Sequence, residues 1–382
     1  MNGTRLSTRL TVPAESTSSR APRATRVARL WRPRRVLVTR SAYERAHGRT
    51  IVDRCTAAGV DDIEVLSGDR LPPLGGDNPR ARYARAKSTL AVVVAPPSKL
   101  TLQPIPPSAD WRFDLAEGCP AHCQYCYLAG SLTGPPITRA YANLDDILGN
   151  LDGYVGRGGV TSKTLARGDE GTTFEASCYT DPLGIEAVTG SLSAAITYFG
   201  EREWAAPVQL RATTKFDDVG PLLDLPHHGR TRIRMSINAA AVSGRFEGGT
   251  ASVAQRIAAL GRLARAGYPV GLTIAPIMPV AEWRSEYGTL IADVSAELAD
   301  IPGLDLTVEL ITHRFTARSK DVLLDWYPAT QLEMSEDLRR LKRGKFGAIK
   351  YVYPAPVMAE LRRWFQSALA TQFPAAKVLY FT

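Results

Sequence analysis

Short apolar runs alternate with amphipathic segments through the central part of the chain, and this alternation predicts the fold. Short runs rich in apolar and β-branched side chains indicate buried strands, whereas apolar positions spaced three or four apart indicate helices. The expected strands cover residues 111–116, 172–178, 208–213, 232–237, 270–275 and 306–311. The expected helices cover residues 144–155, 190–198, 252–266 and 282–298. This order predicts right-handed βα units in an α/β fold, a partial (β/α)6 TIM-like barrel with fewer units than a closed eight-stranded one.

Two further regions flank the predicted barrel. The first contains expected strands at residues 35–39, 63–66 and 87–95 and an expected helix at residues 43–58. This content is typical of a small α/β cap. The second contains the stretch 339–351, which is basic, aromatic and glycine-bounded, and so indicates either a β-hairpin or a solvated turn. We therefore divide the chain into four parts: a tail (residues 1–34), an N-terminal α/β cap (35–110), the barrel (111–316), and a C-terminal hairpin and helix extension (317–382).

The positive charge is concentrated at the start of the chain. The formal net charge is +9, and residues 1–35 contain nine arginines against the single acid Glu15, so residues 36–382 carry only +1. This segment is rich in Ser, Thr, Arg and Pro without apolar periodicity, which predicts disorder. Such a tail can hold DNA phosphates nonspecifically, can be inert, or can be an organellar transit peptide; we favour a bacterial cytoplasmic protein. No apolar run approaches the roughly 20 residues of a membrane span, so no membrane association is expected.

Three of the five cysteines, Cys119, Cys123 and Cys126, form a C-x3-C-x2-C cluster. Thiolates at this spacing can turn toward one point, and soft sulfur selects iron–sulfur clusters or zinc. A structural zinc site needs four closed ligands, so zinc would require His122 or Cys178 as the fourth. A [4Fe–4S] cluster held by three cysteines instead leaves one iron open, and this spacing resembles the signature of radical S-adenosylmethionine (SAM) enzymes. The cysteine pattern does not indicate a secreted disulfide framework, and an oxygen-sensitive cluster requires a reducing cytosol.

The predicted topology brings candidate functional residues to one rim. The cysteine loop follows the first barrel strand, Cys178 ends the second and Lys215 follows the third. Sites in barrels of this type lie at the carboxyl ends of the strands, so these residues are expected to converge.

Several blocks of sequence together resemble spore photoproduct lyases, in order and with few gaps from about residue 80 onward. The blocks are GCPAHCQYCYL at 118–128, FEASCYTDPLGIE at 174–186, TTKF at 213–216, RIRMSIN at 232–238, RAGYPVGLTIAPI at 265–277, VELITHRFT at 308–316, KYVY at 350–353 and AKVLYFT at 376–382. The cysteine spacing alone indicates only a radical SAM enzyme, whereas a lone cysteine in EASC-x-x-D with the other blocks is far more specific.

The resemblance implies repair of the ultraviolet thymine dimer 5-thyminyl-5,6-dihydrothymine by a [4Fe–4S] cluster on Cys119, Cys123 and Cys126 with bound SAM. Reductive cleavage of SAM would yield a 5′-deoxyadenosyl radical, which removes hydrogen from C6 of the lesion before the methylene bridge breaks. The resemblance implies that Cys178 donates hydrogen to the resulting thymine radical.

The resemblance also assigns roles to residues around the cluster. Tyr125 and Tyr127 match tyrosines that pass the radical back so that SAM is regenerated, and Lys215 and Ser236 match SAM contacts. Asn238, two residues along the same strand, is expected to assist. Without the resemblance, Cys178 is equally well a buried core residue, the tyrosines packing aromatics, and Lys215 a solvated charge.

The implied partners are UV-damaged DNA and an electron donor such as flavodoxin or ferredoxin, with the protein itself expected to be a monomer. Chemistry on a base-linked dimer requires extrusion of both thymines and a wedge that fills the gap. Lys345 and Phe346 at the tip of the predicted hairpin, with Arg343 and Lys350 along it, are the expected DNA contacts.

Two departures from the family pattern concern the substrate. Lys345 and Phe346 stand where the family has an Arg-Tyr pair, and Tyr179 replaces a small hydroxyl residue after the donor cysteine. Two alternatives therefore stay open: a radical SAM enzyme of the same fold acting on another lesion or nucleic-acid substrate, and a cluster-bearing nucleic-acid binding protein without turnover.

Overall fold

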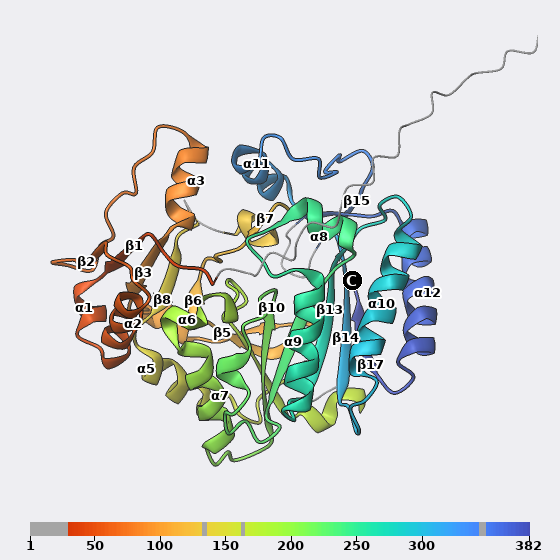
Figure 1. Cartoon of the computed structure of the whole chain (residues 1–382), viewed down its shortest axis with the longest axis horizontal. Helices are drawn as coiled ribbons and strands as arrows, with labels where there is room; N and C mark the ends of the chain where they lie inside the picture. The colour runs from red at the N-terminus through yellow and green to blue at the C-terminus, as the bar shows by residue number, and fades with distance from the viewer. Residues whose placement is uncertain (1–29, 132–135, 162–164, 344–348) are drawn as a thin grey trace, which may run out of the picture.

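A computed structural model describes residues 30–131, 136–161, 165–343 and 349–382 of the chain, and its main feature is an eight-stranded sheet. The strand order is β17-β14-β13-β11-β10-β9-β5-β4, and every neighbouring pair is parallel except β4 with β5. Six of these strands are the predicted ones: β5 (Ala109–Phe113), β9 (Thr172–Ala176), β10 (Val208–Thr214), β11 (Thr231–Ile237), β13 (Val270–Ile277) and β14 (Leu306–Thr312). The predicted partial barrel is therefore confirmed as an open, curled half-barrel (Figure 1).

Two edge strands lie outside the predicted six. They are β4 (Gln103–Ile105), antiparallel at one edge, and β17 (Lys377–Phe381), parallel to β14 at the other. The predicted helices α7 (Ser191–Glu201), α9 (Val253–Arg265) and α10 (Trp283–Leu298) bury apolar faces in the core cluster that the strands share. α9 begins with a capping box, in which Ser252 and Gln255 satisfy each other's backbone amides.

A second sheet covers the N-terminal side of the barrel, in the order β2-β1-β3-β8-β6. β1 (Arg35–Val38), β2 (Ile63–Val65) and β3 (Thr89–Val93) are parallel and come from the predicted cap, together with α1 (Arg40–Tyr43), α2 (Ala46–Ala57) and α3 (Pro79–Lys87). The other two strands, β6 (Ala116–Glu117) and β8 (Thr138–Tyr141), flank the cysteine loop in sequence. The cysteine loop is thus fastened to the N-terminal sheet at both of its ends.

The C-terminal part adds α11 (Ala317–Trp326), the antiparallel pair β15 (Arg340–Arg343) and β16 (Ile349–Val352), and α12 (Ala355–Gln372). The strand pairing of the predicted hairpin is therefore confirmed, whereas Lys345 and Phe346, which the sequence predicts at its tip, lie outside the described residues. α12 packs on α10 at the far side of the barrel from β1 and β2 (Figure 1). In this contact the rings of Trp283 and Trp364 meet edge to face, with their centres 5.2 Å apart. The remaining short elements are α4 (Pro97–Leu100), α5 (Leu144–Gly149), α6 (Glu186–Thr189), α8 (Ala240–Phe246), β7 (His122–Cys123) and β12 (Glu247–Gly248), with 3-10 turns at Tyr127–Gly130, Asn150–Tyr154, Leu165–Glu170, Leu183–Ile185 and Gly220–Leu222.

Across the described ranges, no helix combines the length and the apolar character needed to cross a bilayer.

Candidate active site

One cavity of about 430 Å³ opens at the carboxyl ends of the barrel strands. It collects residues from the cysteine loop and from the ends of β9, β10, β11, β13 and β14. Eight of the predicted site residues line it: Cys119, Cys123, Cys126, Tyr125, Tyr127, Cys178, Lys215 and Ser236. Parallel strands bring these positions together because their carboxyl ends share one edge.

Asn238 is not among the lining residues of this cavity. β11 ends at Ile237, so the alternation that places Ser236 toward the cavity does not continue to Asn238. Its amide donates to Pro276 O at 2.8 Å and accepts from the Tyr287 hydroxyl at 2.9 Å. These bonds occupy the fully buried side chain beside the cavity, and the contact of Asn238 with SAM stays a prediction.

The cysteine loop is held in shape by backbone contacts. Gly118 has φ of 78°, and a Cβ there would lie 2.2 Å from the carbonyl oxygen of Ile137, so only glycine fits. The buried Lys87 ammonium donates to the carbonyl oxygens of both Cys119 and Ala121. β7 of the loop also pairs with β12, which places Glu247 opposite Cys123.

The cysteine loop presents three soft thiol donors, the ligand type of an iron–sulfur cluster. All five cysteines are free, and the three of the loop are half-buried beside the same cavity. In the described part of the chain, no three His, Cys, Asp or Glu side chains converge as ligands of one metal ion. The His122 imidazole instead pairs with the Tyr83 hydroxyl at 3.0 Å through Nδ1. The residues present thus include three soft donors for a cluster but no compact tetrahedral zinc set.

Glu247 is a buried carboxylate of the site that the sequence analysis did not identify. It accepts a hydrogen bond from the Tyr125 hydroxyl and pairs with Arg256. Lys215 Nζ lies 3.8 Å from Glu247 Oε1 and 3.3 Å from Ala275 O, and it also donates to Ser236. Burial raises the pKa of Glu247, but Lys215 and Arg256 outweigh it and hold that pKa below its usual value. Glu247 lies outside every recognisable motif, so no sequence signal identified it.

Cys178 follows a turn at the end of β9. Ser177 adopts a left-handed backbone with φ of 59°, and its hydroxyl accepts from Leu115 N at 2.9 Å. This fixed turn leaves Cys178 as a cavity-lining thiol. Burial, and next the nearby Glu175 and Asp114, raise the pKa of Cys178 well above its ordinary value, so the sulfur stays protonated.

The neighbouring Tyr179 does not line the cavity. Its hydroxyl accepts a hydrogen bond from Arg112, whose guanidinium lies 4.8 Å from the ring centre, and Lys99 lies 5.4 Å from the same ring. The bulky replacement noted in the sequence is therefore accommodated beside two cations, outside the cavity.

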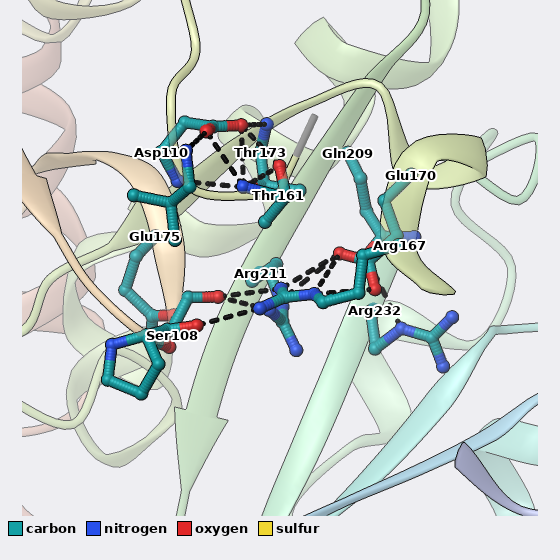
Figure 2. A network of polar contacts seen from close by, with 12 residues as sticks. Ser108, Asp110, Thr161, Arg167, Glu170, Thr173, Glu175, Gln209, Arg211 and Arg232 are labelled. Atoms are coloured by element: carbon teal, nitrogen blue, oxygen red, sulfur yellow. Dashed lines mark hydrogen bonds and ion pairs between the residues drawn. The ribbon is translucent and has the colours of Figure 1, made fainter. Parts of the chain in front are cut away.

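Charged residues rather than apolar ones form the floor of the cavity. Arg234 donates to Glu175 and, at 2.8 Å, to Glu309. Arg211 contacts Glu309 at 3.0 Å and continues toward Glu170 and Arg167 (Figure 2). Beside this group, Asp110 accepts bonds from Thr161 and Thr173 (Figure 2). These ion pairs link β9, β10, β11 and β14 across the floor of the cavity.

Replacing Arg234 with leucine is expected to lower the free energy of unfolding by about 3–5 kcal/mol, because it leaves Glu175 and Glu309 buried with reduced compensation. Urea denaturation monitored by circular dichroism measures the change. Arg202→Leu is the control, since its pair with Asp152 is solvent-exposed and contributes little. Equal losses in the two variants would contradict a stabilising role for the buried network.

A second, basic groove of about 460 Å³ adjoins the cavity, and Arg314 and Thr382 line both. Its cationic residues are Arg314, Arg340, Lys342, Lys350, Arg362 and Arg363. Tyr127 stands at the junction, with Lys350 at 5.2 Å and Arg314 at 5.7 Å from its ring centre. Of the predicted DNA contacts, Lys350 lines this groove, whereas Arg343 is exposed on β15 and is not a lining residue.

An open half-barrel with a three-cysteine loop at its carboxyl rim defines the class of radical SAM enzymes. A family model for spore photoproduct lyase matches residues 31–382. The chain belongs to the spore photoproduct lyase family.

Individual relatives agree with this assignment. The chain is 38% identical to the spore photoproduct lyase of Geobacillus sp. (strain Y412MC61) over 335 residues, which are 88% of this chain and 94% of the relative. It is also 38% identical to that of Bacillus subtilis (strain 168) over 350 residues, 92% and 98% of the two chains. A solved spore photoproduct lyase variant with bound AdoMet and dinucleoside spore photoproduct superposes with a TM-score of 0.84 at 36% identity, covering 93% of this chain and all of that one. A spore photoproduct lyase complexed with the dinucleoside alone superposes with a TM-score of 0.83, also at 36% identity and with the same coverage of the two chains.

Proposed function

We propose that this protein is a radical SAM DNA repair enzyme that cleaves the methylene bridge of 5-thyminyl-5,6-dihydrothymine and restores two thymines. The observation that carries the proposal is the single cavity in which the cysteine loop, Lys215, Ser236 and Cys178 meet. Relatives solved with the dinucleoside lesion bound support the same substrate class.

Cys119, Cys123 and Cys126 would hold a [4Fe–4S] cluster, and Lys215 and Ser236 would contact SAM beside it. When bound, the cluster and SAM supply one electron and a 5′-deoxyadenosyl radical that starts the reaction on the lesion. The Lys215 ammonium suits the SAM carboxylate because it is a point charge inside a partly dehydrated cavity. Glu247 holds Lys215 and Tyr125 in place on the same side of the cavity.

Cys178 would donate the hydrogen atom that quenches the thymine radical after the bridge breaks. A donor of this kind must carry its hydrogen, and the burial that raises the pKa of Cys178 keeps the thiol in that form. The resulting sulfur radical would return to the SAM side through Tyr125 or Tyr127. In that step the sulfur gains the electron and the proton that the tyrosine hydroxyl group loses, which restores the thiol, and the Tyr125 hydroxyl is held in place for it by its hydrogen bond to Glu247.

The position of Tyr179 favours the spore photoproduct over a different lesion. Its ring lies between Arg112 and Lys99, so the departure from the family pattern leaves the cavity wall to Cys178 and Thr180. Repair of another nucleic-acid lesion is the second candidate function, and the departure at Lys345 and Phe346 is the feature that favours it.

The basic groove would hold the DNA backbone next to the lesion. Lys350 and Arg314 mark the edge of the cavity beside Tyr127, and Arg362 and Arg363 continue the positive surface along α12. This extends the predicted hairpin contacts, Arg343, Lys345, Phe346 and Lys350, to a second element of the C-terminal extension.

The double variant Arg362→Ala/Arg363→Ala is expected to bind duplex DNA more weakly and to lower the slope of log K against log salt by about 2. The reason is that each lost arginine removes one phosphate contact and its counterion release. Fluorescence anisotropy with undamaged duplex across a salt series measures both quantities. Arg157→Ala/Lys377→Ala is the control, since Arg157 follows Gly156, whose amide donates to Thr172 at the start of β9, and Lys377 begins β17. An unchanged slope would remove α12 from the DNA interface.

The decisive assay is anaerobic repair with the reconstituted enzyme, dithionite, SAM and synthetic spore photoproduct dinucleotide. Release of thymidine is the expected result, with less 5′-deoxyadenosine than thymidine because the proposed return of the radical regenerates SAM. Formation of 5′-deoxyadenosine without thymidine would retain the radical chemistry and refute the substrate. Absence of both products would leave only a cluster-bearing nucleic-acid binding protein.

A reducing cytoplasm would suit the five free thiols and a cluster on the three loop cysteines. An electron-carrying protein such as a flavodoxin or ferredoxin would replace dithionite there.

A further inference from the structure

A basic, aromatic hollow of about 500 Å³ lies on the other side of the cysteine loop and shares no lining residue with the lesion cavity. It is bordered by the segment before β1, by α3, by the end of α11 and by His122 of the loop. The cysteine loop thus contributes to two separate cavities, one on the lesion side and one here. Neither the repair chemistry nor the DNA groove uses the second.

We propose that this hollow is the docking surface for an acidic one-electron carrier protein, and that electrons enter the cluster through it. The inference rests on the proposed function, in which the cluster must be reduced by one electron before SAM can be cleaved. In this step one electron leaves the flavin or iron–sulfur centre of the carrier and one enters the cluster of this chain. No bond forms or breaks and no proton moves.

The charge of the surface suits such a partner. The hollow is lined by the cationic residues Arg32, Arg34, Arg80 and Lys87. Among its described lining residues, none is acidic. Arg34 and Arg80 are exposed, and within the described ranges no carboxylate pairs with either. A carrier with an acidic face around its redox centre is complementary to this surface.

Aromatic contacts connect the floor of the hollow to the cysteine loop. The Trp326 ring stacks on the Tyr83 ring with their centres 4.8 Å apart, and the Tyr83 ring meets the His122 ring edge to face with their centres 5.8 Å apart. His122 lies between Cys119 and Cys123, and Lys87 bonds the carbonyl oxygens of Cys119 and Ala121 directly. A partner seated against Trp326 would therefore reach the cysteine loop through the contacting series Trp326, Tyr83 and His122. This proximity to the cluster, rather than to the lesion cavity, favours a redox protein over DNA as the occupant.

The test reverses two exposed charges in the holoenzyme, Arg34→Glu/Arg80→Glu, and uses purified flavodoxin as the probe. We expect about a tenfold increase in Kd for flavodoxin at low salt, because rim charges control electrostatically steered association. Surface plasmon resonance measures the Kd, and stopped-flow absorbance measures cluster reduction by reduced flavodoxin. The double variant Arg157→Glu/Lys377→Glu is the control because it makes the same change in net charge near the starts of β9 and β17.

The proposal holds if only the Arg34/Arg80 variant loses flavodoxin affinity and reduction rate. Equal losses in both variants, or no loss in either, would overturn it. Weaker duplex DNA binding with unchanged flavodoxin affinity would assign the surface to nucleic acid instead. Dithionite-driven repair tests the proposed function separately, since dithionite is a small reductant that does not require this surface.

Discussion

Cys178→Ala is expected to cleave SAM at close to the normal rate while losing most of its thymidine product. The cluster loop and the Lys215–Ser236 contact lie on other elements and stay intact, so the radical still forms and the methylene bridge still breaks. The thymine radical then lacks its thiol donor and is quenched by whichever small molecule or solvent species reaches it. Chromatography of the anaerobic reaction should show 5′-deoxyadenosine together with thymine adducts in place of clean thymidine.

The control for this substitution is Cys55→Ala, a second buried cysteine that lies in α2 and packs in the core of the N-terminal sheet. It should give the normal products, because it removes a thiol without touching the cavity. Clean thymidine from Cys178→Ala would show that the hydrogen donor lies elsewhere, and Tyr179 would be the first residue to examine.

Cys126→Ala should abolish both SAM cleavage and repair, because a cluster held by three cysteines has no spare protein ligand. His122 is a poor substitute, since its imidazole is already hydrogen-bonded to the Tyr83 hydroxyl. Iron and sulfide analysis of the reconstituted variant, with its visible absorption spectrum, should show loss of the cluster. Circular dichroism should remain that of the folded chain, since Cys126 lies in a loop outside the barrel strands.

Full iron content and normal 5′-deoxyadenosine formation in Cys126→Ala would remove this residue from the ligand set. Cys55→Ala again serves as the control, because it should incorporate iron normally.

The repeated βα order was predictable because buried parallel strands are nearly continuous apolar runs, as in Val270–Ile277. The strand β17 was missed because its pairing with β14 joins segments far apart in the chain, and local pattern carries no such information. The role of Glu247 was missed for the same reason. Its partner Tyr125 is distant from it in sequence, and its partner Arg256 belongs to no motif. Only the pairing of β7 with β12 places Glu247 opposite Cys123.

Sequence by itself determined the chemistry available: three clustered soft ligands, one isolated thiol after a strand, and a lysine at the end of another strand. These are local patterns, and residue type with spacing is enough to define them. Tertiary structure alone decided which of these residues face a common cavity, and it left Asn238 outside because β11 ends at Ile237. It also decided that Tyr179 points to Arg112 and that the cysteine loop borders a second, basic hollow. Such outcomes depend on contacts between segments far apart in the chain, where packing and charge pairing rather than local pattern set the geometry.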